Sequence, residues 1–221
     1  MREIVPYRTL GGAKKALDNG GRFFNLFAKA DNGVVSGVEL ARAAGVFSSD
    51  LRALLFFEMA VAGLSPGESE TMVAHLSPDV LARLESSRPR TLKPSLVESD
   101  GQAGMPAIVT GYPVFVEDRT QFQGFLIVVV VPTVVLIPIF DKYDVYEVYD
   151  TPELNTVRTV IATTRGSKRM DGLCVRFGGV LKELLFEDKT GKAHGLYLDT
   201  MYYTVLQQTG ALSDGRNHVL S

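Results

Sequence analysis

The chain has 221 residues, which suits one large domain or two small ones, and 46% of them are hydrophobic, which excludes global disorder. Its 23 basic and 25 acidic residues give a formal net charge of −2, with the two signs balanced in both halves. This balance excludes a strong electrostatic attraction to nucleic acid or to an anionic membrane.

Residues 1–88 predict a helical domain of about five short helices. The first helical pattern covers residues 13–30 and is interrupted by a pair of glycines, which separates it into two helices. The next pattern covers residues 38–44 and is expected to end at Gly45.

Capping signals mark the remaining helices of this half. Ser48 is expected to cap a helix whose apolar residues recur at helical spacing over residues 51–62. Residues 65–68 (Ser-Pro-Gly-Glu) combine a capping serine, a proline in the first turn and a glutamate that can close a capping box. Residues 77–79 (Ser-Pro-Asp) open the last helix in the same way.

The second half of the chain follows a different pattern. Residues 89–104 contain Pro, Ser and Gly without periodicity and are predicted to be a linker. Residues 105–210 show short alternating runs and predict a β domain, and residues 211–221 are expected to form a loose tail. Asp199 is expected to cap a terminal helix reaching Leu206, because apolar residues follow it at i, i+4 spacing.

The most apolar stretch is residues 124–140, which reads GFLIVVVVPTVVLIPIF and carries no charge. Its length is near the lower limit of about 17 residues for a membrane helix. However, Val and Ile favour strands, and Pro132 and Pro138 oppose a helix interior. We therefore predict two buried strands that break near residues 132–133, with a membrane span as the alternative.

Short strands separated by glycine-rich turns are typical of a small closed barrel. Residues 171–181 (DGLCVRFGGVL) resemble a strand pair common in the oligonucleotide/oligosaccharide-binding (OB) fold, with Gly178 and Gly179 at a sharp bend. The fold class predicted from the sequence is therefore α+β, with a small N-terminal helical domain followed by a C-terminal antiparallel β-barrel of the OB-like kind.

Residues 16–45 resemble the helix–loop–helix of the EF-hand family. An aromatic-rich helix ends in a Leu-Phe pair, as it does in the family. In the following loop, Gly33, Val35 and Glu39 take the sixth, eighth and twelfth places. The resemblance implies an EF-hand-like helical domain and a possible role in calcium binding.

The resemblance also implies which residues of this chain would hold the metal. Asn32, Ser36 and Glu39 offer side-chain oxygens at the matching places of the loop. The first and third places, which are normally acidic, hold Ala28 and Ala30. A helix–loop–helix that binds no calcium is therefore the alternative.

A second binding hypothesis follows from the OB-like half. Arg165, Lys168 and Arg169 form the densest basic loop of the chain. If single-stranded nucleic acid binds there, aromatic side chains are expected to stack on its bases. The candidates are Phe115, Tyr143 and Tyr146. A solvated turn beside ordinary core aromatics is the alternative.

The single cysteine, Cys174, lies in an apolar segment and is expected to be a buried small side chain. A lone thiol fits a reducing compartment, and residues 1–6 lack the apolar core of a signal peptide. The sequence therefore predicts a cytoplasmic protein that does not associate with a membrane.

The sequence contains no phosphate-binding loop or nucleophile elbow, and its three histidines lack metal-ligand spacing. We therefore expect a non-catalytic binding or assembly protein that acts through protein–protein contacts and needs no cofactor. The alternatives are a calcium-responsive regulator, a single-stranded nucleic-acid binder and an enzyme whose site is assembled from distant residues. The sequence leaves the oligomeric state open.

Overall fold

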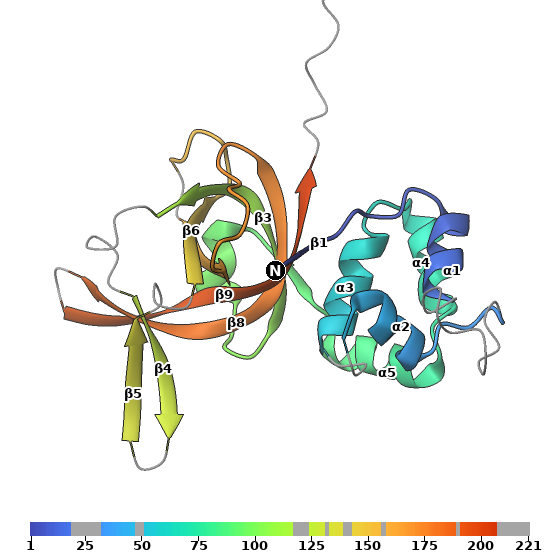
Figure 1. Cartoon of the computed structure of the whole chain (residues 1–221), viewed down its shortest axis with the longest axis horizontal. Coiled ribbons are helices and arrows are strands. Elements are labelled where there is room, and N and C mark those ends of the chain that lie inside the picture. Colours follow the sequence, from blue (N-terminus) through green and yellow to red (C-terminus); the bar gives the residue numbers. More distant parts are fainter. Residues whose placement is uncertain are drawn as a thin grey trace, which may run out of the picture.

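The chain folds into a helical part followed by a sheet, which confirms the predicted order within an α+β protein (Figure 1). The computed structural model describes residues 1–18, 32–46, 51–116, 124–130, 133–138, 143–155, 158–188 and 191–206. The N-terminus lies where the two parts meet (Figure 1).

In the helical part, the predicted signals at Gly45, Ser65 and Ser77 stand at helix ends, whereas the first helix begins three residues before its predicted start. The α-helices of this part are α1 (Leu10–Leu17), α2 (Gly37–Ala44), α3 (Leu51–Val61), α4 (Pro66–Ala74) and α5 (Pro78–Ser87). Gly45 ends α2 in the left-handed region at φ 73°, and Ser65 and Glu68 close a capping box on α4. The predicted cap Ser48 and the second half of the 13–30 pattern lie outside the described residues.

The predicted linker over residues 89–104 contains three short elements. They are the strand β2 (Arg90–Leu92), the 3-10 helix η1 (Pro94–Leu96) and the helix α6 (Val97–Asp100). Val97 is fully buried, and Glu98 Oε1 accepts a hydrogen bond of 2.8 Å from the backbone N–H of Leu196. Elements of three or four residues are too short to show a periodic sequence pattern, so the sequence does not predict them. The domain boundary itself stays a prediction.

One sheet contains all nine strands of the described residues. The strands besides β2 are β1 (Arg2–Glu3), β3 (Pro106–Phe115), β4 (Gly124–Val130), β5 (Thr133–Pro138), β6 (Tyr143–Tyr149), β7 (Thr159–Thr164), β8 (Cys174–Asp188) and β9 (Gly191–Leu206). Most pairs are antiparallel, whereas β1–β9, β2–β3 and β7–β9 are parallel.

The pairing of five strands returns to its starting point. Strand β3 pairs with β6, β6 with β7, β7 with β9, β9 with β8, and β8 with β3 again. A buried cluster lines these strands and includes Tyr146, Ile161, Phe177 and Leu198. We call these five strands the strand ring.

The predicted terminal helix after Asp199 is wrong, because residues 191–206 form the strand β9. This strand pairs with β8 along its whole length, from Cys174↔Leu206 to Asp188↔Gly191. The i, i+4 spacing that favoured a helix also places residues on one face of a strand, since four is an even number. The Tyr-Tyr-Thr-Val run within β9 favours the strand.

The apolar stretch forms two strands, β4 and β5, which confirms the strands of that prediction for the described residues but not their burial in a barrel. They pair antiparallel, with Val128 opposite Val135. The hairpin lies outside the strand ring, however: β4 joins the sheet through β8 alone, at residues 124–126, and the rest projects away (Figure 1). Among the described residues, no helix has the length and apolar composition needed to cross a membrane.

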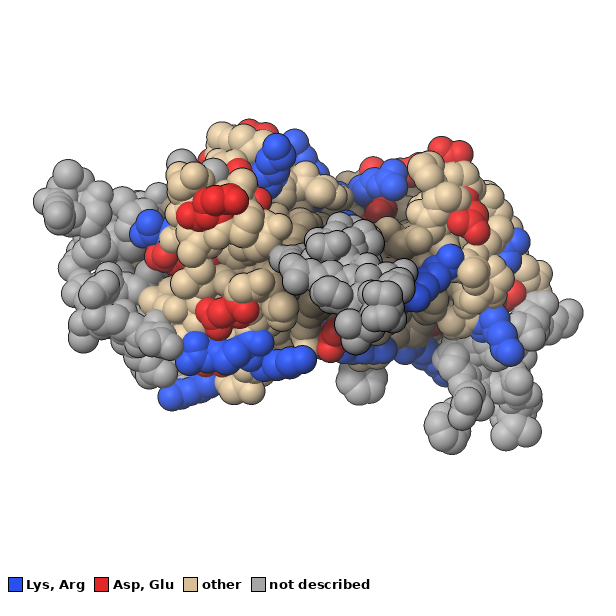
Figure 2. Space-filling view, turned by 90° about the horizontal axis from the view of Figure 1, so that it is seen from above, with Lys and Arg blue, Asp and Glu red and all other residues tan. Residues whose placement is uncertain are grey.

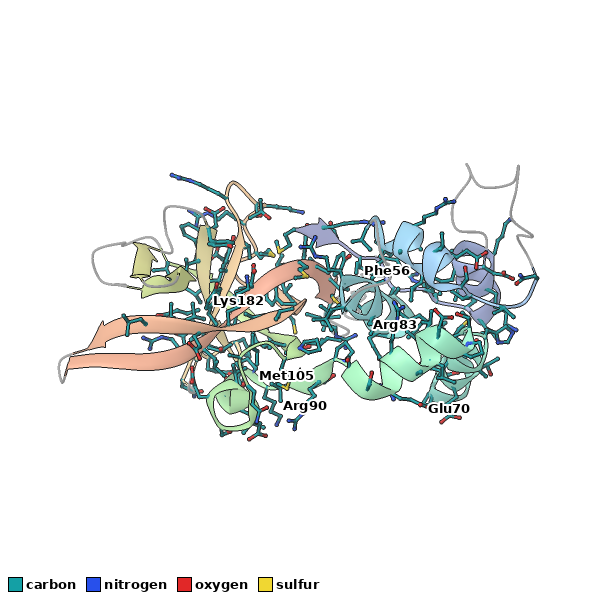
Figure 3. The ribbon with its side chains drawn as sticks, turned by 90° about the horizontal axis from the view of Figure 1, so that it is seen from below. Phe56, Glu70, Arg83, Arg90, Met105 and Lys182 are labelled. Carbon is teal, nitrogen blue, oxygen red and sulfur yellow. The ribbon has the colours of Figure 1, made fainter. Side chains whose placement is uncertain are left out.

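The helical part and the sheet share one hydrophobic core. This core combines residues of α1 to α5 with Ile108 of β3 and Tyr202 of β9. Phe56 of α3 lies where the helices face the sheet (Figure 3) and meets the ring of Tyr202 edge-on at 6.1 Å. The Arg2 guanidinium lies over Phe56, 5.6 Å from the ring centroid, so the N-terminal strand also contacts the helices where they meet the sheet.

The register between β8 and β9 shifts between Gly178 and Gly179, where the pairing passes over Met201 of β9. A Cβ on Gly179 would lie 2.3 Å from the carbonyl oxygen of Asp199 on β9. A Cβ on Gly178 would lie 2.4 Å from Sδ of the buried Met59 on α3. The backbone contact therefore requires glycine at position 179, whereas a side chain at position 178 would require Met59 to move.

We expect Gly179→Ala to lower the free energy of unfolding by about 1–3 kcal/mol, because the backbone of Asp199 has no room to move. Urea denaturation followed by circular dichroism measures the change. Gly67→Ala is the matched control, since a Cβ there meets no atom within 4 Å and favours helix α4. Equal stability of the two variants would contradict the explanation.

Candidate functional site

The loop predicted to hold calcium is built around a capping box at the start of α2. Glu39 Oε2 accepts hydrogen bonds from the backbone N–H of Ser36 at 2.8 Å and from its hydroxyl at 2.7 Å. Ser36 Oγ in turn accepts from the backbone N–H of Glu39. Glu39 is only 5% exposed. The Ser-x-x-Glu spacing of residues 36–39 signals this role in the sequence, and our sequence interpretation missed it.

The rest of the described loop is held by backbone contacts. Asn32 Oδ1 accepts a hydrogen bond of 2.8 Å from the N–H of Val34, as in an Asx turn. Val35 pairs with Leu76 between α4 and α5, through an N–H bond to the His75 carbonyl at 2.7 Å. The loop is therefore fixed to the next helical pair.

All three predicted ligands thus already bond within the loop: Asn32 bonds with Val34, and Ser36 and Glu39 bond with each other. Ala28 and Ala30 lie outside the described residues. In the ranges that the structure does describe, no three His, Cys, Asp or Glu side chains gather in a way that suits a metal ion. Calcium binding by this loop stays a prediction.

The basic loop joins β7 to β8 and brings Arg165, Lys168 and Arg169 together at an exposed turn. Asp144 on β6 holds the turn, because its Oδ2 accepts hydrogen bonds from the N–H groups of Gly166 at 2.6 Å and Ser167 at 3.1 Å. The Asp144 carboxylate therefore fixes the backbone turn that carries the side chains of Arg165, Lys168 and Arg169.

The aromatic side chains beside this loop are already in contact with protein groups. The Arg169 guanidinium lies 3.4 Å from the ring centroid of Phe115, and Asp171 Oδ1 accepts a 2.7 Å hydrogen bond from the Phe115 N–H. Tyr146 is fully buried and meets Phe115 edge-on at 5.3 Å, while Tyr143 is half-buried. Arg169 thus covers the Phe115 face that a base would need. Nucleic-acid binding here stays a prediction.

Burial also changes the acidity of Tyr146. Desolvation raises the pKa of its hydroxyl to about 12, and the carboxylates of Asp171 and Asp144 act in the same direction. The neutral hydroxyl lies 3.5 Å from the carbonyl of Lys168. Tyr146 therefore belongs to the core that supports the loop.

The third candidate is the projecting end of the sheet, which we call the arm. It consists of the β4–β5 hairpin together with residues 184–188 of β8 and 191–195 of β9. Residues 125–130 and 134–137 are all Phe, Leu, Ile or Val. The sequence predicts the strands but not their position, since a run of apolar residues does not reveal whether its strands enter the strand ring.

A groove of about 320 Å³ lies between the helical part and the sheet. The N-terminal ammonium of Met1 at its edge donates a 2.6 Å hydrogen bond to Thr164 Oγ1. Arg2 donates to the carbonyls of Ala43 and Ala44 at the end of α2, and Asp199 pairs with Lys182. Of these contacts, those of Arg2 join the N-terminal strand to α2, whereas the other two lie within the sheet. These contacts assign the groove no ligand.

No protein-family model, no curated protein and no solved structure matches this chain.

Replacing Ser36 by Ala should lower the free energy of unfolding by about 1 kcal/mol, because α2 loses its capping hydroxyl. Ser36→Thr keeps the hydroxyl and is the control. Thermal or urea unfolding of both variants makes the comparison. An unchanged Ser36→Ala protein would show that the capping box contributes nothing to stability.

Alkaline pH should destabilise the protein through Tyr146. The unfolded side chain ionises near its usual pKa of 10.0, whereas the folded one keeps its proton up to about 12. Its contribution to stability is therefore complete below pH 10 and is lost as the pH rises from 10 to about 12. Tyr146→Phe should make the free energy of unfolding fall less steeply across this range. Parallel profiles for the two proteins would contradict this role.

Proposed function

We propose that this chain is a non-catalytic binding and assembly protein that acts through protein–protein contacts. In this proposal the strand ring is a rigid scaffold of the OB-like kind, and the arm is the element that meets the partner. The observation that carries the proposal is the uncharged β4–β5 hairpin, which joins the sheet at one end only.

The order of pairings supports an OB-like barrel. Strands β3, β6 and β7 are three successive antiparallel neighbours, and β8 returns to lie beside β3. This 4-1-2-3 order is that of a Greek key. Strand β9 then pairs with both β7 and β8, which is how a five-stranded Greek-key barrel closes.

The position of the arm supports its role in binding. OB folds bind through the face of their second and third strands and through the loops between strands one and two and between strands four and five. In this chain the β4–β5 hairpin lies between the first two strands of the ring, β3 and β6. The β8–β9 turn lies between the last two. Both connections meet in the arm, where β4 pairs with β8.

The composition of the hairpin supports a protein as the partner. Residues 125–130 and 134–137 carry no charge and no hydrogen-bonding side chain. Moving apolar side chains from water into a protein contact lowers the free energy by about 25 cal/mol per Å² of buried surface. Contiguous apolar surface is typical of interaction sites.

The calcium and nucleic-acid hypotheses have less support from the described residues, because Glu39 closes a capping box and Arg169 covers Phe115. Each remains open to a direct test. Calorimetric heat on addition of millimolar calcium would favour the loop of Asn32, Ser36 and Glu39. A gel shift with single-stranded nucleic acid that weakens with salt would favour the basic loop.

Replacing residues 125–137 with a short Gly-Ser linker should abolish the capture of partner proteins by the tagged chain. Quantitative mass spectrometry of proteins that co-purify with the two forms makes the comparison. The control is Arg165→Ala with Lys168→Ala, which leaves the arm intact and should capture the same proteins. If the linker form retains every partner while the control loses them, the proposal is wrong and the basic loop is the binding element.

A further inference from the structure

We propose that the partner at the arm is a second copy of this chain, with strand β5 pairing antiparallel to the β5 of that copy across a two-fold axis. This inference rests on the proposed function and specifies its partner. The paired hairpins would form one continuous sheet that runs from the β8 of one copy to the β8 of the other.

Strand β5 is an edge of the sheet. Its neighbour is β4, with Val130 opposite Thr133 and Phe125 opposite Pro138, and no described strand pairs with its other side. Alternate backbone N–H and C=O groups of an edge strand point away from the sheet and offer a template for another strand. Another strand can pair with these groups in place of water.

The composition of β5 lacks the features that block edge pairing. Monomeric proteins protect their edges with charged residues, bulges or an interrupting proline. Residues 133–137 read TVVLI, and the proline of β5 stands at its end, at Pro138. At the opposite edge of the arm, residues 191–195 of β9 read GKAHG. That edge carries Lys192 and two glycines, which weaken strand pairing.

A second copy fits this edge because antiparallel pairing about a two-fold axis uses the same strand twice. An uncharged strand brings no like charges into opposition across the axis. A lipid bilayer would cover apolar residues but leave the edge backbone without hydrogen-bond partners, which is costly in hydrocarbon.

The surroundings of β5 also permit association. The hairpin projects away from the helices, so a second copy has access to it (Figure 1). The net charge is −2, and Figure 2 shows Lys and Arg side chains interspersed with Asp and Glu over one face of the molecule. Long-range repulsion between two copies is therefore small.

The test compares two Val→Lys substitutions by sedimentation velocity over a range of concentrations. Val135→Lys places a charge in the middle of β5, opposite Val128. Val38→Lys adds the same charge at an exposed position of α2, where Val38 is 58% exposed. We expect the wild type and Val38→Lys to form dimers, and the dissociation constant of Val135→Lys to rise by about tenfold or more.

Hydrogen exchange of the wild type gives a second measurement that needs no variant. Amides of residues 133–137 should become more protected as the concentration rises, while amides of the basic loop, residues 165–169, should not change. The inference is overturned if the wild type stays monomeric at its highest soluble concentration, or if dimers form equally well with Val135→Lys. Binding to phosphatidylcholine vesicles by a protein that never self-associates would also overturn it.

These outcomes separate this inference from the proposed function. A monomeric wild type that still captures a different protein through residues 125–137 rejects the second copy as partner but keeps the arm as a binding element. A protein that neither self-associates nor captures partners through the arm rejects both.

Discussion

The antiparallel ladder between β8 and β9 is the interaction on which the rest of the structure depends. It runs the whole length of both strands, from Cys174↔Leu206 to Asp188↔Gly191. The other side of β8 receives β3 in its first half and β4 in its second. One strand therefore belongs to the strand ring at one end and to the arm at the other. The register of this ladder shifts at Gly178 and Gly179, where Gly179 lies against the backbone of β9 and Gly178 against the Met59 side chain of α3.

Strand β9 connects the sheet to the helices. Its second half pairs with β1, where Ile4 donates its N–H to the Tyr203 carbonyl and accepts from the Thr204 hydroxyl, each at 2.8 Å. Tyr202 on the same strand joins the helical core and donates to the carbonyl of Ala44 at the end of α2. The first residues of the chain thus tie the helices to its last strand. We infer that the helical part and the strand ring are oriented rigidly, since their core is shared.

This rigidity bears on the proposed function. The shared core fixes the strand ring that carries the arm, whereas the hairpin itself joins the sheet only where β4 pairs with β8. The basic loop and the capped loop of the helical part are held by internal hydrogen bonds, from Asp144 and Glu39 respectively. The hairpin differs from both loops because the outer edge of β5 pairs with no described strand.

The sequence by itself determined the local structure. Serine caps, a proline in the first turn and Gly45 define α2, α4 and α5, and the Val-rich run with its prolines forms strands. These features act within a few residues, where propensity and hydrogen bonding to near neighbours dominate. Only the tertiary structure decided that residues 199–206 are a strand, that β4 and β5 leave the strand ring, and that Arg169 covers Phe115. Each depends on contacts between segments that are distant in the sequence. An i, i+4 pattern fits both a helix and a strand, and an apolar run does not show which strand lies beside it.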